Sequence, residues 1–217
     1  MKKTELLVTA LWLFILSNLF YPHVTLSNDM KTVFPLTMDQ KKTLLTIAKD
    51  TIGLYVNDGK ILAVNNQDPR LSEEEGTFVT IHKFGQLRGC IGNILGNGPL
   101  YLLVREIAIA SASQDPRFPS VKKEELKDLE IEISVLSKPK VITNIDEIKM
   151  GVDGVIVSQG FHQGVFLPQV ATETGWSKEE FLSELCSQKA GLSRDCYKNP
   201  ETTIRIFTAN VFSQKDF

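Results

Sequence analysis

Apolar and polar residues follow two different periods along this chain, and the periods predict different elements. Over 38–56 and 99–113, apolar side chains recur every three to four residues, which is the spacing of one face of an amphipathic helix. Over 129–136, apolar and polar residues alternate one by one, which is typical of an antiparallel strand with one buried face. A capping box formed by Thr37 and Gln40 marks the start of the first helix.

The remaining strands are predicted from β-branched runs and the turn residues between them. Two strand-like runs within 76–94 meet at Phe84-Gly85, and two more, at 153–158 and 165–170, flank a glycine-bounded turn. A final strand is expected over 203–212. Hairpins mixed with helices, without repeating βαβ units, predict an α+β fold with a mainly antiparallel sheet and flanking helices.

The N-terminus has the pattern of an export signal. Lys2 and Lys3 precede an apolar run over 6–20, which is shorter than the roughly twenty residues of a membrane-spanning helix. We therefore divide the chain into residues 1–27, a signal peptide or an uncleaved N-terminal anchor, and a domain over 28–217. The pattern predicts a periplasmic, extracellular or membrane-anchored protein. A buried N-terminal helix is the alternative.

Composition narrows the classes of function. A chain of 217 residues with 42% hydrophobic content can bury one good core, and a net charge of −2 argues against nucleic-acid binding. Three cysteines leave at least one thiol unpaired, and the sequence leaves open whether Cys186 and Cys196 form a disulfide. No Cys-x-x-Cys or His-Glu-x-x-His motif is present, so we predict neither a metal site nor a cofactor.

Residues 87–92, Leu-Arg-Gly-Cys-Ile-Gly, are the main candidate for chemistry. Side chains alternate along a strand, so Arg88, Cys90 and Gly92 are expected on one face and Gly89 on the other. One hypothesis makes Cys90 a nucleophile or redox thiol that Arg88 activates. The alternative makes Cys90 a small packed residue between two glycines that allow close approach.

His82 is the candidate base for Cys90, and its position depends on the hairpin register. A two-residue turn at Phe84-Gly85 pairs Val79 with Cys90 and puts His82 on the opposite face. A three-residue loop pairs Phe78 with Cys90 and puts His82 on the face of the cysteine. An ordinary exposed strand residue is the other interpretation of His82.

Three further residues are candidates for ligand binding. Asp115 and Arg117 lie in a stiff two-proline loop, where they are either ligand-facing or a helix cap with a local ion pair. Arg88 and Arg117 together would suit an anionic ligand, which two guanidinium groups can hold bidentately. Gln169 follows Pro168 and is either directed toward a cleft or a strand-edge residue.

Six blocks of sequence, in order, resemble the AMME chromosomal region (AMMECR) domain family, which includes the A component of AmmeMemoRadiSam gene systems. The resemblance covers roughly residues 38–213, and its blocks are 87–92, 115–118, 132–136, 153–157, 167–171 and Cys186 with 189–192. It implies two subdomains around an antiparallel sheet, with the strand of Cys90 bordering a cleft.

The resemblance implies partners but no reaction. A Memo-like protein and a radical SAM enzyme accompany family members in the gene systems, and typical members look cytosolic, which gives a cytoplasmic alternative to export. We expect a binding module that recognises a partner protein or a small anionic ligand through a cleft. The ligand-binding residues would be Gly89, Gly92, Asp115, Arg117 and Gln169. The alternative is an enzyme that uses Cys90 with Arg88, and with His82 as base, on a small anionic or peptide-like substrate in a modification or redox pathway.

Overall fold

The computed structural model describes residues 35–217, so the predicted signal or anchor lies outside the described residues. The described residues form four α-helices, namely α1 (Met38–Asp58), α2 (Leu100–Ser113), α3 (Pro168–Thr174) and α4 (Lys178–Glu184). They also form seven strands, namely β1 (Gly76–Lys83), β2 (Gln86–Asn93), β3 (Leu129–Leu136), β4 (Lys140–Ile142), β5 (Asp153–Gln159), β6 (His162–Phe166) and β7 (Thr203–Ser213). Within residues 35–217, no helix is both long and apolar enough to cross a bilayer.

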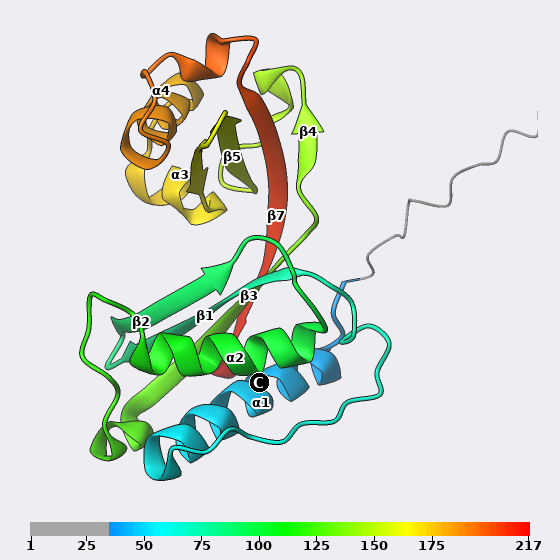
Figure 1. Cartoon of the computed structure of the whole chain (residues 1–217), viewed down its shortest axis with the longest axis vertical. Coiled ribbons are helices and arrows are strands. Elements are labelled where there is room, and N and C mark those ends of the chain that lie inside the picture. Colours follow the sequence, from blue (N-terminus) through cyan, green and yellow to red (C-terminus); the bar gives the residue numbers. More distant parts are fainter. Residues whose placement is uncertain (1–34) are drawn as a thin grey trace, which may run out of the picture. The chain divides into compact units, whose positions relative to one another are not determined.

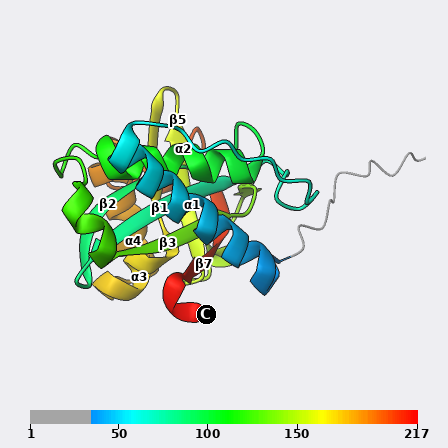
Figure 2. The same ribbon diagram turned by 90° about the horizontal axis from the view of Figure 1, so that it is seen from below.

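In the N-terminal half of the domain, α1 and α2 cover one face of strands β2, β1 and β3 (Figures 1 and 2). The capping box at Thr37 and Gln40 is present, and Gly59 ends α1 in the left-handed conformation that glycine adopts without strain. Inward-facing side chains of the strands, such as Val79 and Ile133, pack with the apolar stripes of both helices in one core. The helices and the alternating strand predicted here are confirmed.

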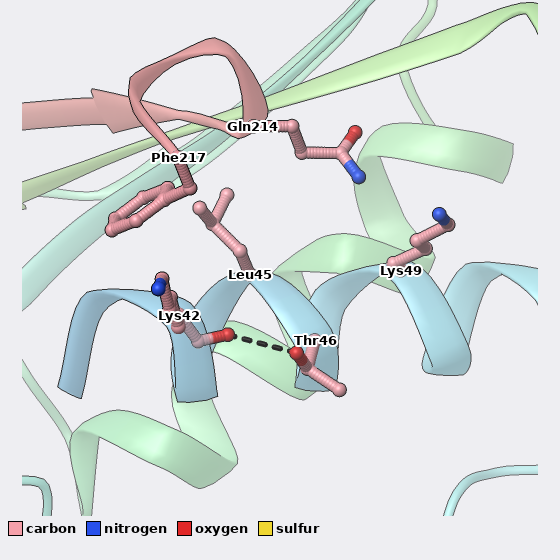
Figure 3. Close-up of a pocket in the computed structure, with 6 residues that line it drawn as sticks. All are labelled: Lys42, Leu45, Thr46, Lys49, Gln214 and Phe217. Carbon is pink, nitrogen blue, oxygen red and sulfur yellow. Dashed lines mark hydrogen bonds between the residues drawn. The ribbon is translucent and has the colours of Figure 1, made fainter. Parts of the chain in front are cut away.

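Strand β7 connects the two halves of the domain. Its last residues pair with β3, while its first residues pair with β5 and β4, giving the order β2-β1-β3-β7-β5-β6. After β7, a short turn over Gln214–Asp216 lies beside α1 (Figure 3). All strand pairs are antiparallel, which confirms the α+β fold with a mainly antiparallel sheet.

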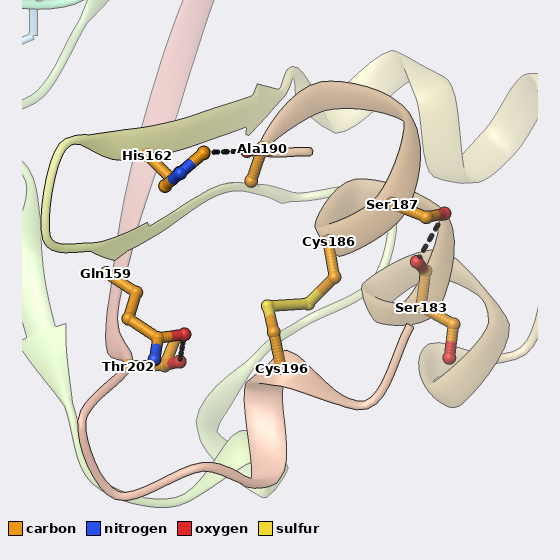
Figure 4. The surroundings of a disulfide bond; sticks show 8 residues. All are labelled: Gln159, His162, Ser183, Cys186, Ser187, Ala190, Cys196 and Thr202. Carbon is orange, nitrogen blue, oxygen red and sulfur yellow. Dashed lines mark hydrogen bonds between the residues drawn. A yellow bond between two sulfur atoms is a disulfide. The ribbon is translucent and has the colours of Figure 1, made fainter. Parts of the chain in front are cut away.

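The C-terminal half has a core of its own, in which β4, β5 and β6 pack with α3 and α4. A disulfide joins Cys186, in the helical turn after α4, to Cys196 (Figure 4). Both cysteines are almost completely buried. The pairing that the sequence left open is therefore present in the structure.

The second hairpin differs from its prediction. We expected a strand over 165–170, but β6 ends at Phe166 and α3 begins at Pro168. Proline suits the first position of a helix, because the missing N–H has no intrahelical partner there. The turn itself is only Gly160-Phe161, so β6 starts earlier than the glycine spacing suggested.

Candidate functional site

Gly89 is required by the approach of helix α2 to the sheet. A Cβ atom at this position would overlap the carbonyl oxygen of Ser111. The Ser111 hydroxyl enters the sheet itself, accepting the N–H of Ile91 at 3.0 Å and donating to the carbonyl of Val79 at 2.7 Å. The Ser111 hydroxyl thus bridges Ile91 of β2 and Val79 of β1, and the absence of a Cβ at Gly89 lets α2 come close enough to place it there.

Gly92 has a similar packing role on the opposite face of β2. It pairs across the strands with Phe78, and a Cβ atom at Gly92 would overlap the Phe78 ring. Both glycines predicted to bind ligand are therefore accounted for by contacts within the protein. Among these neighbouring residues, Cys90 has a side chain that could take part in a reaction.

Cys90 is a free thiol and is only partly buried. Its side chain lies on the sheet face opposite α1 and α2, outside the core formed by those helices. The hydroxyl of Thr80, its cross-strand neighbour, donates to Cys90 Sγ at 3.3 Å. Cys90 is therefore partly buried, which does not decide between the reactive thiol and the packing residue that the sequence left open.

A β-bulge gives the hairpin a register that neither sequence alternative anticipated. The turn at Phe84-Gly85 has two residues, as in the first alternative, but Arg88 is an extra residue in β2. Cys90 consequently pairs with Thr80 rather than with Val79 or Phe78. Because Thr80 and His82 are two residues apart on β1, His82 lies on the face of the cysteine, although no hydrogen bond joins the two.

Arg88 is fully engaged away from Cys90. Its guanidinium forms two hydrogen bonds with the Glu125 carboxylate and donates to the carbonyls of Pro119 and Ser120. Hydrogen bonds from Arg88 hold the pKa of Glu125 well below its usual range, with Lys83 adding to the effect. Arg88 thus fixes the bulge to the loop after α2, and all of these contacts are internal.

Asp115 and Arg117 hold the main chain of Cys90 at the open edge of the sheet. Strand β2 is the edge strand, and Asp115 accepts the N–H of Cys90 at 2.8 Å while Arg117 donates to its carbonyl at 3.2 Å. The two side chains also pair with each other at 2.7 Å. The hydrogen bond from Arg117 keeps the pKa of the buried Asp115 well below its usual range. The pair protects an edge that would otherwise expose unpaired backbone groups.

A cleft that borders this sheet face lies between the two halves of the domain and has a volume of about 670 Å³. His82 and Glu132 line it from the sheet, and Gln169 and Glu173 line it from α3. Val211 of β7, which is 39% exposed, also lines it. The Gln169 side-chain oxygen is buried and accepts no hydrogen bond from any described residue.

The structure therefore separates the predicted site residues into two groups. His82 and Gln169 meet in the cleft, whereas Arg88, Asp115 and Arg117 act within the protein around the strand of Cys90. Thr80 links the groups, because it lies between Cys90 on β2 and Glu132 on β3. Among residues 35–217, no cluster of histidine, cysteine and carboxylate side chains has the arrangement of a metal site.

Sequence reasoning missed Thr80, Glu132 and Ser111. Ser111 is a polar residue inside the apolar stripe of a helix, which is itself a signal that its hydroxyl has a buried partner. Glu132 belongs to the alternating strand that the sequence predicted. It lines the cleft opposite α3, and the start of α3 was predicted as strand, so the cleft itself was not anticipated there.

Comparison with known proteins gives one consistent result. A family model described as AMMECR1 matches residues 45–212. A protein of Methanothermobacter thermautotrophicus is 44% identical over 187 residues, which cover 83% of this chain and 97% of that protein. Protein PH0010 of Pyrococcus horikoshii is 40% identical over 194 residues, covering 84% of this chain and 94% of that protein. The crystal structure of PH0010, described as an uncharacterised protein, matches with a TM-score of 0.72 over 79% of this chain and 90% of that chain.

Proposed function

This chain belongs to the AMMECR1 family, and from that premise we propose that it is a binding module whose cleft takes a polypeptide segment bearing a cationic N–H donor. The observation that carries the proposal is the lining of the cleft. Its volume of about 670 Å³ lies within the range of ligand pockets, which is roughly 300–1,000 Å³.

The polar groups that line the cleft are mainly hydrogen-bond acceptors, so they would suit a ligand with a hydrogen-bond donor. Glu132 and Glu173 supply two carboxylates, and neither forms an ion pair or a hydrogen bond with another side chain of residues 35–217. The Gln169 oxygen is an acceptor without a donor. No lysine or arginine lines this cleft, so the lining disfavours the small anionic ligand expected from the sequence.

The cleft also offers apolar surface beside these acceptors. Val211 and Val152 are among the exposed large apolar residues, and both line the cleft. A second hollow of about 210 Å³ shares His82 and Glu132 with the first. An extended segment with a lysine or arginine and an aliphatic neighbour would complement both kinds of surface.

A peptide library tests this proposal. Hexapeptide pools with one position fixed as lysine, arginine, glutamate or norleucine would be measured by fluorescence anisotropy. We expect the lysine and arginine pools to bind at least tenfold more tightly than the others. Glu132→Gln should remove this preference and Val211→Trp should block binding, while Glu124→Gln, outside the cleft, should change neither.

Two results would contradict the proposal. Tightest binding by the glutamate pool would mean that the site takes anions. Binding that Val211→Trp leaves unchanged would mean that the peptide lies elsewhere.

A cysteine-dependent enzyme is the second candidate, and the Thr80 hydrogen bond to Cys90 Sγ favours it. Reactive cysteines lie in partly exposed, electropositive surroundings, and Cys90 is partly exposed. With Cys186 and Cys196 joined, Cys90 is the one free thiol of the three cysteines, so labelling reports on it alone. Alkylation by iodoacetamide at pH 7, faster than that of N-acetylcysteine, would support this candidate. Labelling only after unfolding would exclude it.

Export remains our proposal for localisation, and the Cys186–Cys196 disulfide supports it. Disulfides persist in oxidising compartments and are rare in the cytosol. A fusion of alkaline phosphatase to the C-terminus, which is active only outside the cytoplasm, would test it. An association with a Memo-like protein or a radical SAM enzyme stays a prediction from the family resemblance.

A further inference from the structure

A third hollow, of about 300 Å³, lies between α1 and the C-terminal turn, apart from the cleft of about 670 Å³ (Figure 3). Leu45 and Phe217 supply its apolar surface, and Lys42 and Lys49 flank Leu45 on α1. The two lysines are seven residues apart, which places them about 10 Å from each other along the helix axis. Leu45 is only 5% exposed and forms the floor of the hollow, whereas Phe217 is 44% exposed and supplies most of its open apolar surface.

The two lysines have different neighbours. Lys42 Nζ lies 5.2 Å from the centre of the Phe217 ring, a cation–π contact that holds this ring against α1. Lys49 lies at the other end, where the Gln214 amide nitrogen is directed toward it (Figure 3). Because the Gln214 oxygen accepts the N–H of Ile131, the amide nitrogen is left as a donor.

These donors have no acceptor within the protein. Neither Lys42 nor Lys49 forms an ion pair with any carboxylate of residues 35–217, and the Gln214 nitrogen has no hydrogen-bond partner there. Lys49 and Gln214 thus offer an ammonium and an amide N–H₂ at one end of an apolar hollow. This combination suits an oxygen-bearing anion whose apolar part lies on Leu45.

We propose that this hollow binds a small soluble anionic amphiphile, with its carboxylate between Lys49 and Gln214 and its short aliphatic chain over Leu45 toward Phe217. The hollow is at the lower end of the size range of ligand pockets, so the ligand is a short-chain or medium-chain acid. The site shares no lining residue with the cleft of about 670 Å³, although Gln214 also lines the hollow of about 210 Å³ beside that cleft. The proposal for this site does not depend on the function proposed for the cleft.

Octanoate is the probe that tests the proposal, with the full chain labelled with ¹⁵N and followed by NMR. We expect shifts centred on Leu45, Thr46 and Lys49. Lys49→Met, which removes the ammonium group but keeps an unbranched apolar side chain, should weaken octanoate binding at least tenfold. Lys60→Met, an exposed lysine outside the hollow, is the matched control and should leave binding unchanged.

Three comparison ligands separate the parts of the proposal. Acetate has the head without the chain and octylamine has the chain with the opposite charge, so both should bind at least tenfold more weakly than octanoate. Equal binding of either compound overturns the proposal, as does an unchanged affinity in Lys49→Met. Vesicles of phosphatidylglycerol should show no dependence on Lys49. A vesicle affinity that falls in Lys49→Met, with no response to octanoate, would assign the site to a lipid headgroup and overturn the soluble ligand.

Discussion

Replacing Gly89 with alanine tests why the cysteine motif contains glycine. The new methyl group would overlap the Ser111 carbonyl, so α2 has to move away from the sheet. Such overpacking costs about 1–3 kcal/mol. The movement also weakens the two hydrogen bonds of the Ser111 hydroxyl, each worth about 0.5–1.5 kcal/mol. We therefore expect a loss of about 2–6 kcal/mol in the free energy of unfolding.

Urea unfolding followed by far-UV circular dichroism measures this loss. Gly53→Ala is the matched control, because Gly53 lies within α1 and a Cβ there would meet nothing within 4 Å. Alanine is the better helix former, so this control should gain up to about 1 kcal/mol. The same chemical change should thus have opposite signs at the two positions.

The double variant with Ser111→Ala makes the test sharper. Ser111→Ala alone leaves the Ile91 N–H and the Val79 carbonyl without their partner, at about 1–3 kcal/mol for each unsatisfied group. If Gly89→Ala acts by displacing Ser111, the two losses overlap and the double variant loses less than their sum. Additive losses, or a Gly89→Ala variant within about 0.5 kcal/mol of the natural chain, would refute the explanation.

Three further predictions concern the same region and the disulfide. The fold lowers the pKa of Asp115 below its unfolded value of about 3.9, so the ionised carboxylate stabilises the fold above that pH, and this stabilisation is lost as the pH falls below it. Between pH 5 and pH 2, Asp115→Asn should therefore lose less free energy of unfolding than the natural chain, as measured by urea unfolding. An equal loss in the two proteins would contradict the assignment. Cys186→Ser with Cys196→Ser should lower the free energy of unfolding by about 3 kcal/mol, because the bond restricts the conformations of the unfolded chain between the two cysteines. An unchanged urea midpoint would contradict this. Thr80→Val removes the hydroxyl that donates to Cys90 Sγ, so iodoacetamide should label Cys90 more slowly, whereas an equal or higher rate would show that the hydroxyl has no effect on the thiol.

The elements of this fold could be predicted because each has a local cause. The first helix has both an apolar stripe and a capping box at Thr37, and β3 alternates over its first seven residues. The error at 165–170 arose because a β-branched run and a helix-starting proline overlap there, and local pattern alone does not decide between them.

The candidate site could be predicted only in part, because its geometry depends on distant contacts. The bulge at Arg88 is stabilised by Glu125, which lies 37 residues later, and a one-residue shift decides which residue faces Cys90. Asp115 and Arg117 were expected to bind a ligand or to form a local ion pair, and nothing local to their loop indicates that they also hold the main chain of Cys90. The family resemblance led us to expect a cleft bordered by the strand of Cys90, but no residue of β2 lines the cleft described above, whose acidic lining comes from β3 and α3.

Strand β7 has a consequence for the order in which this protein can fold. It is the last described strand in the chain, yet it lies in the middle of the sheet, between β3 and β5. During synthesis, the earlier strands emerge first and leave the edges of β3 and β5 unpaired until residues 203–213 arrive. Both halves of the domain should therefore complete their folding late and together, and a chain that stops before β7 should expose two sheet edges to aggregation.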